Sequence, residues 1–355
     1  MDRFRIDSHK LMYHVGRVSE WLKGDDVYPI YVEVSPSGAC NHRCTYCGLD
    51  YMGYQNRFLR TETIKERLTE MGRLGIKSIM YAGEGEPFLH KDIASIINHT
   101  KSSGIDVAVT SNGVLFSEKI IEAALPSITW IKISFNAGTP ATYAKVHRTA
   151  EKDFNIALEN IRRAVKMRDS SGLATTIGMQ IILLPENAGE VAGLARLAKD
   201  TGADYLVIKP YSQHLKSITK EYSDFKYSGY YRLEEELKKI SDSRFKVIFR
   251  LRTMEKLEEE ERAYEKCLAL PFWSYIDSTG GVWGCSAHLS DERFLFGDIN
   301  KNTFEEIWSG EKRKKTMRFV REELDTGKCR VNCRMDEINR FLHDLVTPPA
   351  HVNFI

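Results

Sequence analysis

The sequence predicts an α/β protein, namely a partial (β/α)6 barrel of the TIM type followed by a small α+β domain. Two patterns carry this prediction. Apolar strand-like runs alternate with helix-like segments from about residue 27 to residue 211, which is typical of parallel βα units, and the alternation then stops. Because six units are too few for a closed eight-stranded barrel, we expect an open barrel with its site at the carboxyl ends of the strands.

The elements follow in chain order. The predicted strands of the barrel are residues 30–34, 78–81, 106–110, 130–135, 176–183 and 205–208. Thr63 and Glu66 predict a capping box at the start of the first intervening helix, and Gly75 and Gly104 mark the ends of the first two helices. Beyond the barrel we expect a helix at 231–241, a strand at 245–251 and a solvated, charge-rich helix at 254–266. A hairpin at 273–285 and an amphipathic helix from about Thr303 follow.

These elements predict an N-terminal extension (1–26), a barrel (27–211), a connecting segment (212–266), a second domain (267–340) and a C-terminal tail (341–355). The 51 basic and 49 acidic residues give a net charge of +2, and no basic cluster is interleaved with aromatic residues, which argues against nucleic acid as a partner. No apolar run resembles a signal peptide or a membrane span, so we expect no membrane association and a cytoplasmic location. Seven cysteines in a reducing compartment indicate metal ligands rather than disulfides.

Three of these cysteines follow the first predicted strand. Cys40, Cys44 and Cys47 have the spacing C-x3-C-x2-C. Three thiolates suit a four-iron cluster and leave one iron open for an exogenous ligand. A structural zinc knuckle or buried free thiols are the alternatives.

This spacing, with an aromatic residue (Tyr46) before the last cysteine, resembles the radical S-adenosylmethionine (SAM) superfamily. The resemblance implies a [4Fe-4S] cluster that binds SAM and cleaves it to a 5′-deoxyadenosyl radical. The segment 83–87 is similar to the family's glycine-glutamate-proline segment, which contacts the methionine amino group, although Glu84 stands where glycine is usual. An ordinary βα turn is the alternative for this segment.

Short polar residues at later strand ends imply further SAM contacts by the same resemblance. Arg148 is expected at the methionine carboxylate, with a surface arginine as the alternative, and Gln180 is expected in the barrel interior or bonded to backbone. The predicted cofactor-binding residues are Tyr46, Gly83, Glu84, Gly85, Glu86, Ser111, Asn112, Ser134, Asn136, Arg148 and Gln180. No catalytic residue is assigned. Asp50, Tyr51, Lys209, Tyr211 and the tail 348–355 are candidates for substrate contact by position alone.

The other four cysteines lie in the second domain, at Cys267, Cys285, Cys329 and Cys333. Their spacing resembles the auxiliary-cluster domains called SPASM and, in the shortened form with one cluster, twitch. The resemblance implies a second [4Fe-4S] cluster, which four protein thiolates would ligate fully. A four-cysteine zinc site is the alternative.

A fully ligated second cluster favours electron transfer, so the sequence predicts a radical SAM oxidoreductase. The expected reaction is dehydrogenation of a sugar-like or aminocyclitol small molecule, with flavodoxin or ferredoxin as electron donor. Modification of a peptide or protein side chain is the first alternative, and redox-neutral epimerisation or rearrangement is the second. Outside the enzyme class, the alternative is a non-catalytic iron–sulfur redox sensor.

Overall fold

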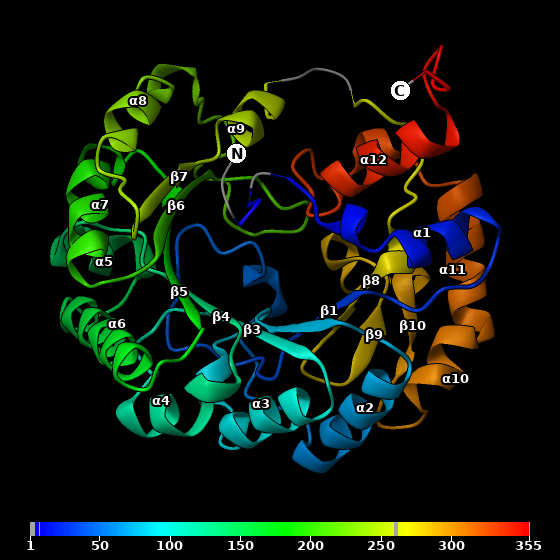
Figure 1. The fold of residues 1–355 in the computed structure, drawn as a ribbon, viewed down its shortest axis with the longest axis horizontal. Coiled ribbons are helices and arrows are strands. Elements are labelled where there is room, and N and C mark those ends of the chain that lie inside the picture. The colour runs from blue at the N-terminus through cyan, green and yellow to red at the C-terminus, as the bar shows by residue number, and fades with distance from the viewer. Residues whose placement is uncertain (1–3, 7, 259–261, 355) are drawn as a thin grey trace.

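The computed structural model describes residues 4–6, 8–258 and 262–354. One ten-stranded sheet runs through the molecule in the order β10-β9-β8-β1-β2-β3-β4-β5-β6-β7, and it curves around a central space (Figure 1). Neighbouring strands from β8 through β1 to β7 are parallel, whereas β8, β9 and β10 are antiparallel. The strands are β1 (Tyr31–Val34), β2 (Ser78–Tyr81), β3 (Asp106–Ser111), β4 (Trp130–Ser134), β5 (Thr176–Leu183), β6 (Tyr205–Pro210), β7 (Lys246–Phe249), β8 (Trp273–Ile276), β9 (Gly281–Trp283) and β10 (Leu295–Asp298).

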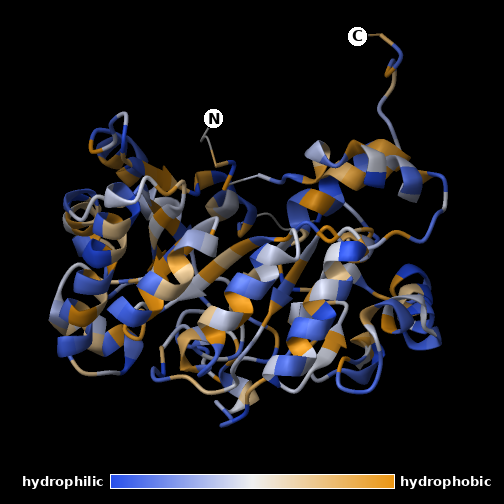
Figure 2. Ribbon diagram, turned by 60° about the horizontal axis from the view of Figure 1, so that its bottom comes forward, coloured by the Kyte–Doolittle hydropathy of each residue, from blue (hydrophilic) through white to orange (hydrophobic). Residues whose placement is uncertain are grey.

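Helices cover the outer face of this sheet (Figure 1). They are α1 (Val15–Leu22), α2 (Thr61–Arg73), α3 (Ile93–Ser102), α4 (Glu118–Ala124), α5 (Pro140–His147), α6 (Lys152–Ser170), α7 (Val191–Asp200), α8 (Leu233–Lys238), α9 (Leu251–Lys256), α10 (Phe304–Ser309), α11 (Glu311–Glu322) and α12 (Asp336–Val346). Hydrophobic and hydrophilic residues alternate around the outer helices, as expected when one side packs on a sheet (Figure 2). No helix of the described residues is both long and apolar enough to cross a membrane.

The inner face of the sheet differs from the outer face because side chains alternate along a strand. In β5, Ile177, Met179 and Ile181 are buried in the apolar core beneath the helices, whereas Gln180 and Ile182 line an interior cavity. Gly178 shares the inner face, where a Cβ would come within 2.1 Å of the Tyr205 ring. The barrel is therefore packed from outside and left open within.

The parallel sheet is longer than the sequence indicated. The strand expected in the connecting segment is β7, which pairs in parallel with β6. The predicted hairpin is also present, but its first strand, β8, pairs in parallel with β1. The barrel and the C-terminal hairpin therefore share one continuous sheet, and the cysteines around the hairpin lie beside the barrel opening.

Two local predictions were wrong. α2 begins at Thr61 and has no side-chain cap, so Thr63 lies inside the helix and forms no capping box. The helix expected at 254–266 ends at Lys256, where α9 ends. Lys256 is buried rather than solvated, because its ammonium group pairs with Asp336 at 2.8 Å. Residues 259–261 of that expected helix lie outside the described residues.

Candidate active site

The first cysteine group lies in the loop that follows β1. Cys40, Cys44 and Cys47 are all partly buried. The N–H groups of Arg43 and Thr45 donate hydrogen bonds to carbonyls at the C-terminal end of α5, over 3.1 and 2.9 Å. The barrel therefore holds the three thiols in place through backbone contacts.

The chemistry of this donor set fits an iron–sulfur cluster. Burial raises the pKa of Cys40 to about 12, and the nearby Glu86 carboxylate adds to the rise. Burial also raises the pKa of Cys44 and of Cys47. A metal ligand must be a deprotonated thiolate. Thiols with pKa values as high as these lose their protons at neutral pH only when a metal cation binds. Three protein thiolates match a cluster with one open iron.

Tyr46, the aromatic residue of the motif, is fixed by a buried chain of polar groups. Its hydroxyl accepts a hydrogen bond from Asn136 Nδ2 at 2.6 Å and lies 3.1 Å from His147 Nδ1. His147 Nε2 lies 3.0 Å from the Phe135 carbonyl, so it carries the proton and Nδ1 accepts from Tyr46. Burial lowers the pKa of His147 to about 3, which keeps the imidazole neutral. The same imidazole lies 3.2 Å from Cys44 Sγ.

Asn136 was predicted to contact SAM, yet its side chain is engaged elsewhere. Its Oδ1 accepts from the N–H of Ile182 at 2.7 Å, and its Nδ2 donates to Tyr46. The side chain is fully buried. Asn136 therefore supports the cysteine loop from behind, and its direct contact with the cofactor stays a prediction.

The segment Gly83–Pro87 follows β2 and packs directly on the cysteine loop. The N–H of Glu86 donates to the Ala39 carbonyl at 2.8 Å. A Cβ at Gly85 would lie 2.0 Å from that same oxygen, so only glycine allows the approach. The buried Glu86 carboxylate accepts from Ser111 Oγ at 2.7 Å and from the N–H of Asn112 at 2.9 Å. Glu86, Ser111 and Asn112 thus form one network at the ends of β2 and β3.

Glu84 explains the departure from the family's glycine. Its buried carboxylate accepts from the N–H of Ser278 at 3.0 Å and from its hydroxyl at 2.8 Å, and it pairs with Arg57 at 2.8 Å. Ser278 lies in the turn between β8 and β9. The Glu84 side chain therefore joins the barrel to the C-terminal hairpin, and it is not part of the cavity lining.

Asn112 and Arg148 differ in how the structure places them. Asn112 Nδ2 donates to Asn41 Oδ1 at 2.7 Å, which ties the end of β3 to the cysteine loop. Arg148 follows α5 in a left-handed conformation, with φ of 48°. It is exposed and does not line the cavity. Arg148 therefore does not lie with Ser134 and Gln180, two of the predicted SAM-binding residues that line the cavity.

One cavity of about 930 Å³ reaches both cysteine groups. Tyr46 and Cys47 line it beside the first group, and Ser134 and Gln180 line it within the barrel. The four remaining cysteines, Cys267, Cys285, Cys329 and Cys333, line it as well. Gln180 Nε2 donates to Ser134 Oγ over 3.5 Å, and Gln180 Oε1 is buried without a hydrogen-bond partner among the described residues.

The cavity also holds charged residues that sequence reasoning missed. Lys132 of β4, Arg330 and Arg334 line it together with Glu33 of β1. The available signal was a lysine alternating with apolar residues inside a strand, since Lys132 lies between two buried isoleucines. Lys209, a candidate by position alone, lines the same cavity.

Two other candidates by position have different roles. The Asp50 carboxylate accepts from the N–H groups of Ile218 and Thr219, each at 2.9 Å, and so fixes the loop after β6. Tyr51 stacks on His214 with ring centroids 5.2 Å apart, and its hydroxyl is buried without a partner among the described residues. Neither lines the cavity. Residues 348–354 of the tail are exposed.

The second cysteine group is too open for a single zinc ion. Zinc–sulfur bonds of about 2.3 Å in a tetrahedron place the sulfurs roughly 4 Å apart. Among the described residues, the one group of three such ligand atoms within 4.8 Å of one another is His42, Cys44 and His147. The spacing of the four C-terminal thiols therefore suits a larger metal–sulfur cluster. Burial raises their pKa values, that of Cys267 to about 12.

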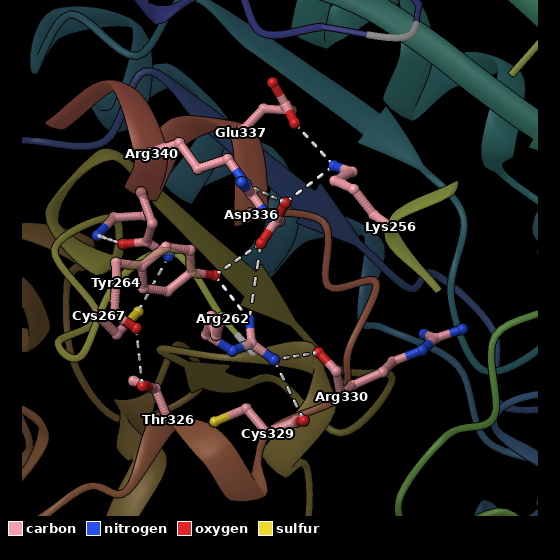
Figure 3. A network of polar contacts seen from close by, with 12 residues as sticks. Lys256, Arg262, Tyr264, Cys267, Thr326, Cys329, Arg330, Asp336, Glu337 and Arg340 are labelled. Carbon is pink, nitrogen blue, oxygen red and sulfur yellow. Dashed lines mark hydrogen bonds and ion pairs between the residues drawn. The ribbon is translucent and has the colours of Figure 1, made fainter. Parts of the chain in front are cut away.

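A network of buried charges positions this second group (Figure 3). The Arg262 guanidinium donates to the carbonyls of Cys329 at 3.3 Å and Arg330 at 3.0 Å. Asp336 accepts from Lys256 Nζ at 2.8 Å and from the Tyr264 hydroxyl at 3.0 Å. These contacts link the end of α9, the loop before β8 and the start of α12.

Comparisons with known proteins agree with this geometry. Residues 34–198 match the family model of the radical SAM superfamily. Residues 267–334 match the SPASM model, described as an iron–sulfur cluster-binding domain. The two matches contain all seven cysteines.

The similar curated proteins are distant. A probable GTP 3′,8-cyclase of Methanothermobacter marburgensis is 26% identical over 181 residues, 51% of this chain and 57% of that protein. A tungsten-containing aldehyde ferredoxin oxidoreductase cofactor-modifying protein of Pyrococcus furiosus is 22% identical over 309 residues, 80% and 81% of the two chains. The chain thus spans little more than half of the first relative.

Among solved structures, Streptococcus suis SuiB bound to its precursor peptide SuiA has a TM-score of 0.67 and 15% identity, over 90% of this chain and 74% of that one. This likeness shows the fold. Both family models match, and Cys47 and the four C-terminal cysteines line one cavity. The chain therefore belongs to the radical SAM superfamily, as an enzyme that uses SAM and a [4Fe-4S] cluster and carries a C-terminal SPASM iron–sulfur domain.

Proposed function

We propose that this enzyme removes a hydrogen atom from a substrate bound in the cavity that both cysteine groups reach, that the substrate radical releases a proton to water, and that the second cluster accepts the remaining electron, so that the net reaction is an oxidation. The observation that carries the proposal is the cavity whose lining includes both Cys47 and the four C-terminal cysteines. A substrate in this cavity lies within reach of both metal sites.

The bound cluster and SAM supply the 5′-deoxyadenosyl radical when reduced. The chain's own residues hold and enclose the reactants. Tyr46, fixed by Asn136 and His147, holds the cysteine loop against the barrel. Glu84 keeps the hairpin docked on the barrel, and residues of β8 to α12 complete the cavity wall. We expect flavodoxin or ferredoxin to deliver the electron, and a cytoplasmic location.

The lysines in the cavity lining favour some classes of small-molecule substrate over others. An aminocyclitol carries ammonium groups, which would meet the ammonium groups of Lys132 and Lys209. A sugar-like molecule without amino groups, or one that carries an acidic group, suits the cavity better. The proposed substrate is therefore not an aminocyclitol.

Peptide modification is the second candidate. The likeness to SuiB in complex with a precursor peptide favours it, since a similar fold there accommodates a peptide. The names of the GTP 3′,8-cyclase relatives support a third possibility, a redox-neutral rearrangement.

A deuterium experiment separates these reactions. The reconstituted enzyme is incubated with SAM, dithionite and size-fractionated extract from cells grown in deuterated medium. Transfer of deuterium to 5′-deoxyadenosine identifies the fraction that contains the substrate. Transfer from the fraction below 3 kDa, with a product lighter by two hydrogens, supports the proposal. A product of unchanged mass shows a rearrangement, and transfer from the heavier fraction alone shows a peptide or protein substrate.

A further inference from the structure

Two lysines of the barrel project into the cavity from alternate strands. Lys132 lies on β4 and Lys209 on β6, and both line the cavity. Between them lies β5, whose inner face presents Gly178 and Gln180. The Tyr205 ring occupies the space beside Gly178, and Ile182 lies opposite Lys209, so the polar side chain that β5 presents between the two lysines is that of Gln180.

The acidic residues of the lining are already paired. Glu33 binds Arg334 at 2.8 Å. Asp336 binds Lys256 at 2.8 Å, and Glu337 binds the same ammonium group at 2.7 Å. Within the described residues, neither Lys132 nor Lys209 has an ion pair or a hydrogen bond to an acidic group, and the one polar contact recorded for Lys132 is with the Trp130 ring, 5.7 Å away.

The residues around the two lysines add further positive charge. Lys209 is repelled by Lys132 and by Arg250, Arg330 and Arg334, and burial with this repulsion holds its pKa well below the ordinary value. The pKa of Lys132 is lowered to about 8, chiefly by burial and then by the neighbouring arginines. The lowered pKa values express the cost of enclosing these charges, and a bound anion relieves that cost and favours the protonated form of both amines.

One more polar atom of the cavity lacks a partner. Gln180 Oε1 is buried and accepts no hydrogen bond from the described residues, while the Nε2 of the same amide contacts Ser134. A buried carbonyl oxygen of this kind calls for a donor, such as a hydroxyl or an N–H group on a ligand.

We propose that Lys132 and Lys209 bind an anionic group of the substrate, a carboxylate or a phosphate, and that Gln180 Oε1 accepts a hydrogen bond from the same molecule. This inference rests on the proposed function in that it places the substrate in the cavity. The substrate is therefore an organic acid or a phosphate ester with a hydroxyl or N–H donor near the acidic group. The other possible source of the anion is the methionine carboxylate of SAM.

The test measures binding, without turnover. The iron-loaded protein is titrated with inorganic phosphate and with succinate, in the presence and absence of saturating SAM, and the affinity for SAM is measured separately. The variants are Lys132→Met, Lys209→Met and the double change. Lys166→Met serves as the control, because Lys166 is exposed on α6 and lies outside the cavity.

We expect the protein with SAM bound to bind phosphate or succinate, and each cavity variant to bind at least about tenfold more weakly, as for loss of a charge-assisted contact. Lys166→Met should match the wild type, and Lys209→Arg should restore binding to within about threefold. Iron content and thermal midpoint verify that each variant is folded; where a methionine variant fails this check, the glutamine variant replaces it.

Anion affinity that is equal in the wild type and in the double variant overturns the inference. The inference is also overturned if the lysine variants lose affinity for SAM and if saturating SAM abolishes anion binding to the wild type. In that case the two lysines hold the carboxylate of SAM. The proposed function is judged by a different readout, deuterium transfer to 5′-deoxyadenosine, so either proposal can fail while the other stands.

Discussion

The Glu84 carboxylate accepts two hydrogen bonds from Ser278, one from its N–H at 3.0 Å and one from its hydroxyl at 2.8 Å. Glu84 belongs to the segment that follows β2, whereas Ser278 lies in the turn between β8 and β9. The contact therefore spans the barrel and the C-terminal hairpin, and it occupies the position where the radical SAM motif usually has glycine.

Replacement of Glu84 should loosen this junction without removing SAM. Glu84→Ala leaves the N–H of Ser278 and Arg57 without their acceptor, and we expect the free energy of unfolding to fall by about 3 kcal/mol. Glu84→Gly should lose similar stability while its affinity for SAM stays within about twofold of wild type. Urea unfolding and SAM titration measure both quantities.

Glu122→Ala is the matched control for the loss of a carboxylate, because Glu122 is exposed on α4; its stability should change by less than about 0.5 kcal/mol. If Glu84→Gly binds SAM tenfold more weakly than wild type at unchanged stability, residue 84 acts on the cofactor and not on the junction.

Tyr46→Phe tests the polar chain behind the cysteine loop. The change leaves Asn136 Nδ2 without its acceptor at 2.6 Å, and an unsatisfied buried donor costs about 1–3 kcal/mol. We expect a lower thermal midpoint and faster loss of iron to a chelator. Asn136→Ala should produce a larger loss, since it also removes the acceptor for the N–H of Ile182. Equal chelation rates for all three proteins would show that the chain does not support the loop.

The pKa of Lys132, about 8, predicts a pH-dependent affinity for anions. Its cationic form binds the anion, so affinity should fall as pH rises through about 8, and bound anion should move the midpoint upward. The charged groups that act on it are Arg334, Arg250 and Glu33, and Lys209 faces the same space. Sulfate, which keeps its charge from pH 7 to 9.5, is the probe. Lys132→Met should flatten the profile, and an equally steep profile in that variant would assign the titration to another group.

The secondary structure of the barrel was largely predictable because each strand is a local apolar run. β2 and β5 have the predicted bounds, and the other four strands of the predicted barrel differ by one or two residues. The pairing of β7 with β6 and of β8 with β1 was not predictable, since it depends on contacts distant in sequence. Lys256 shows the same limit: its charge indicated solvent, but its partner Asp336 is 80 residues away.

In the candidate site, too, the features set by local sequence were predictable and those set by distant contacts were not. Cysteine spacing was enough to predict the metal ligands, because that signal is contained within short segments. The direction in which Glu84 and Asn136 point depends on Ser278 and Tyr46, which no local pattern specifies. Lys132 was missed because a lysine within an apolar strand has no meaning until the strand's inner face is known.

Asp336→Asn tests the network that positions the second cysteine group. Asp336 and Lys256 are both buried, and removal of the Asp336 charge leaves Lys256 paired with Glu337 alone, which costs about 1–3 kcal/mol. We expect a lower thermal midpoint and reduced iron at the second site, with the first site retained. Asp344→Asn is the control, because it changes an exposed carboxylate of the same helix. Wild-type iron content and midpoint in Asp336→Asn would mean that the backbone alone positions the cysteines.

Iron counting tests the assignment of both cysteine groups. The wild-type protein, reconstituted without oxygen, should hold about eight irons per chain, because each group fits one four-iron cluster. Alanine at Cys40, Cys44 and Cys47 should leave about four irons and abolish SAM cleavage. Alanine at the four C-terminal cysteines should also leave about four, but should retain SAM cleavage, since the first group is held by β1 and α5. Only net oxidation of substrate should then be lost. If the protein holds four irons and one zinc, the second group carries no electron, and the proposed oxidation gives way to a redox-neutral reaction in the same cavity.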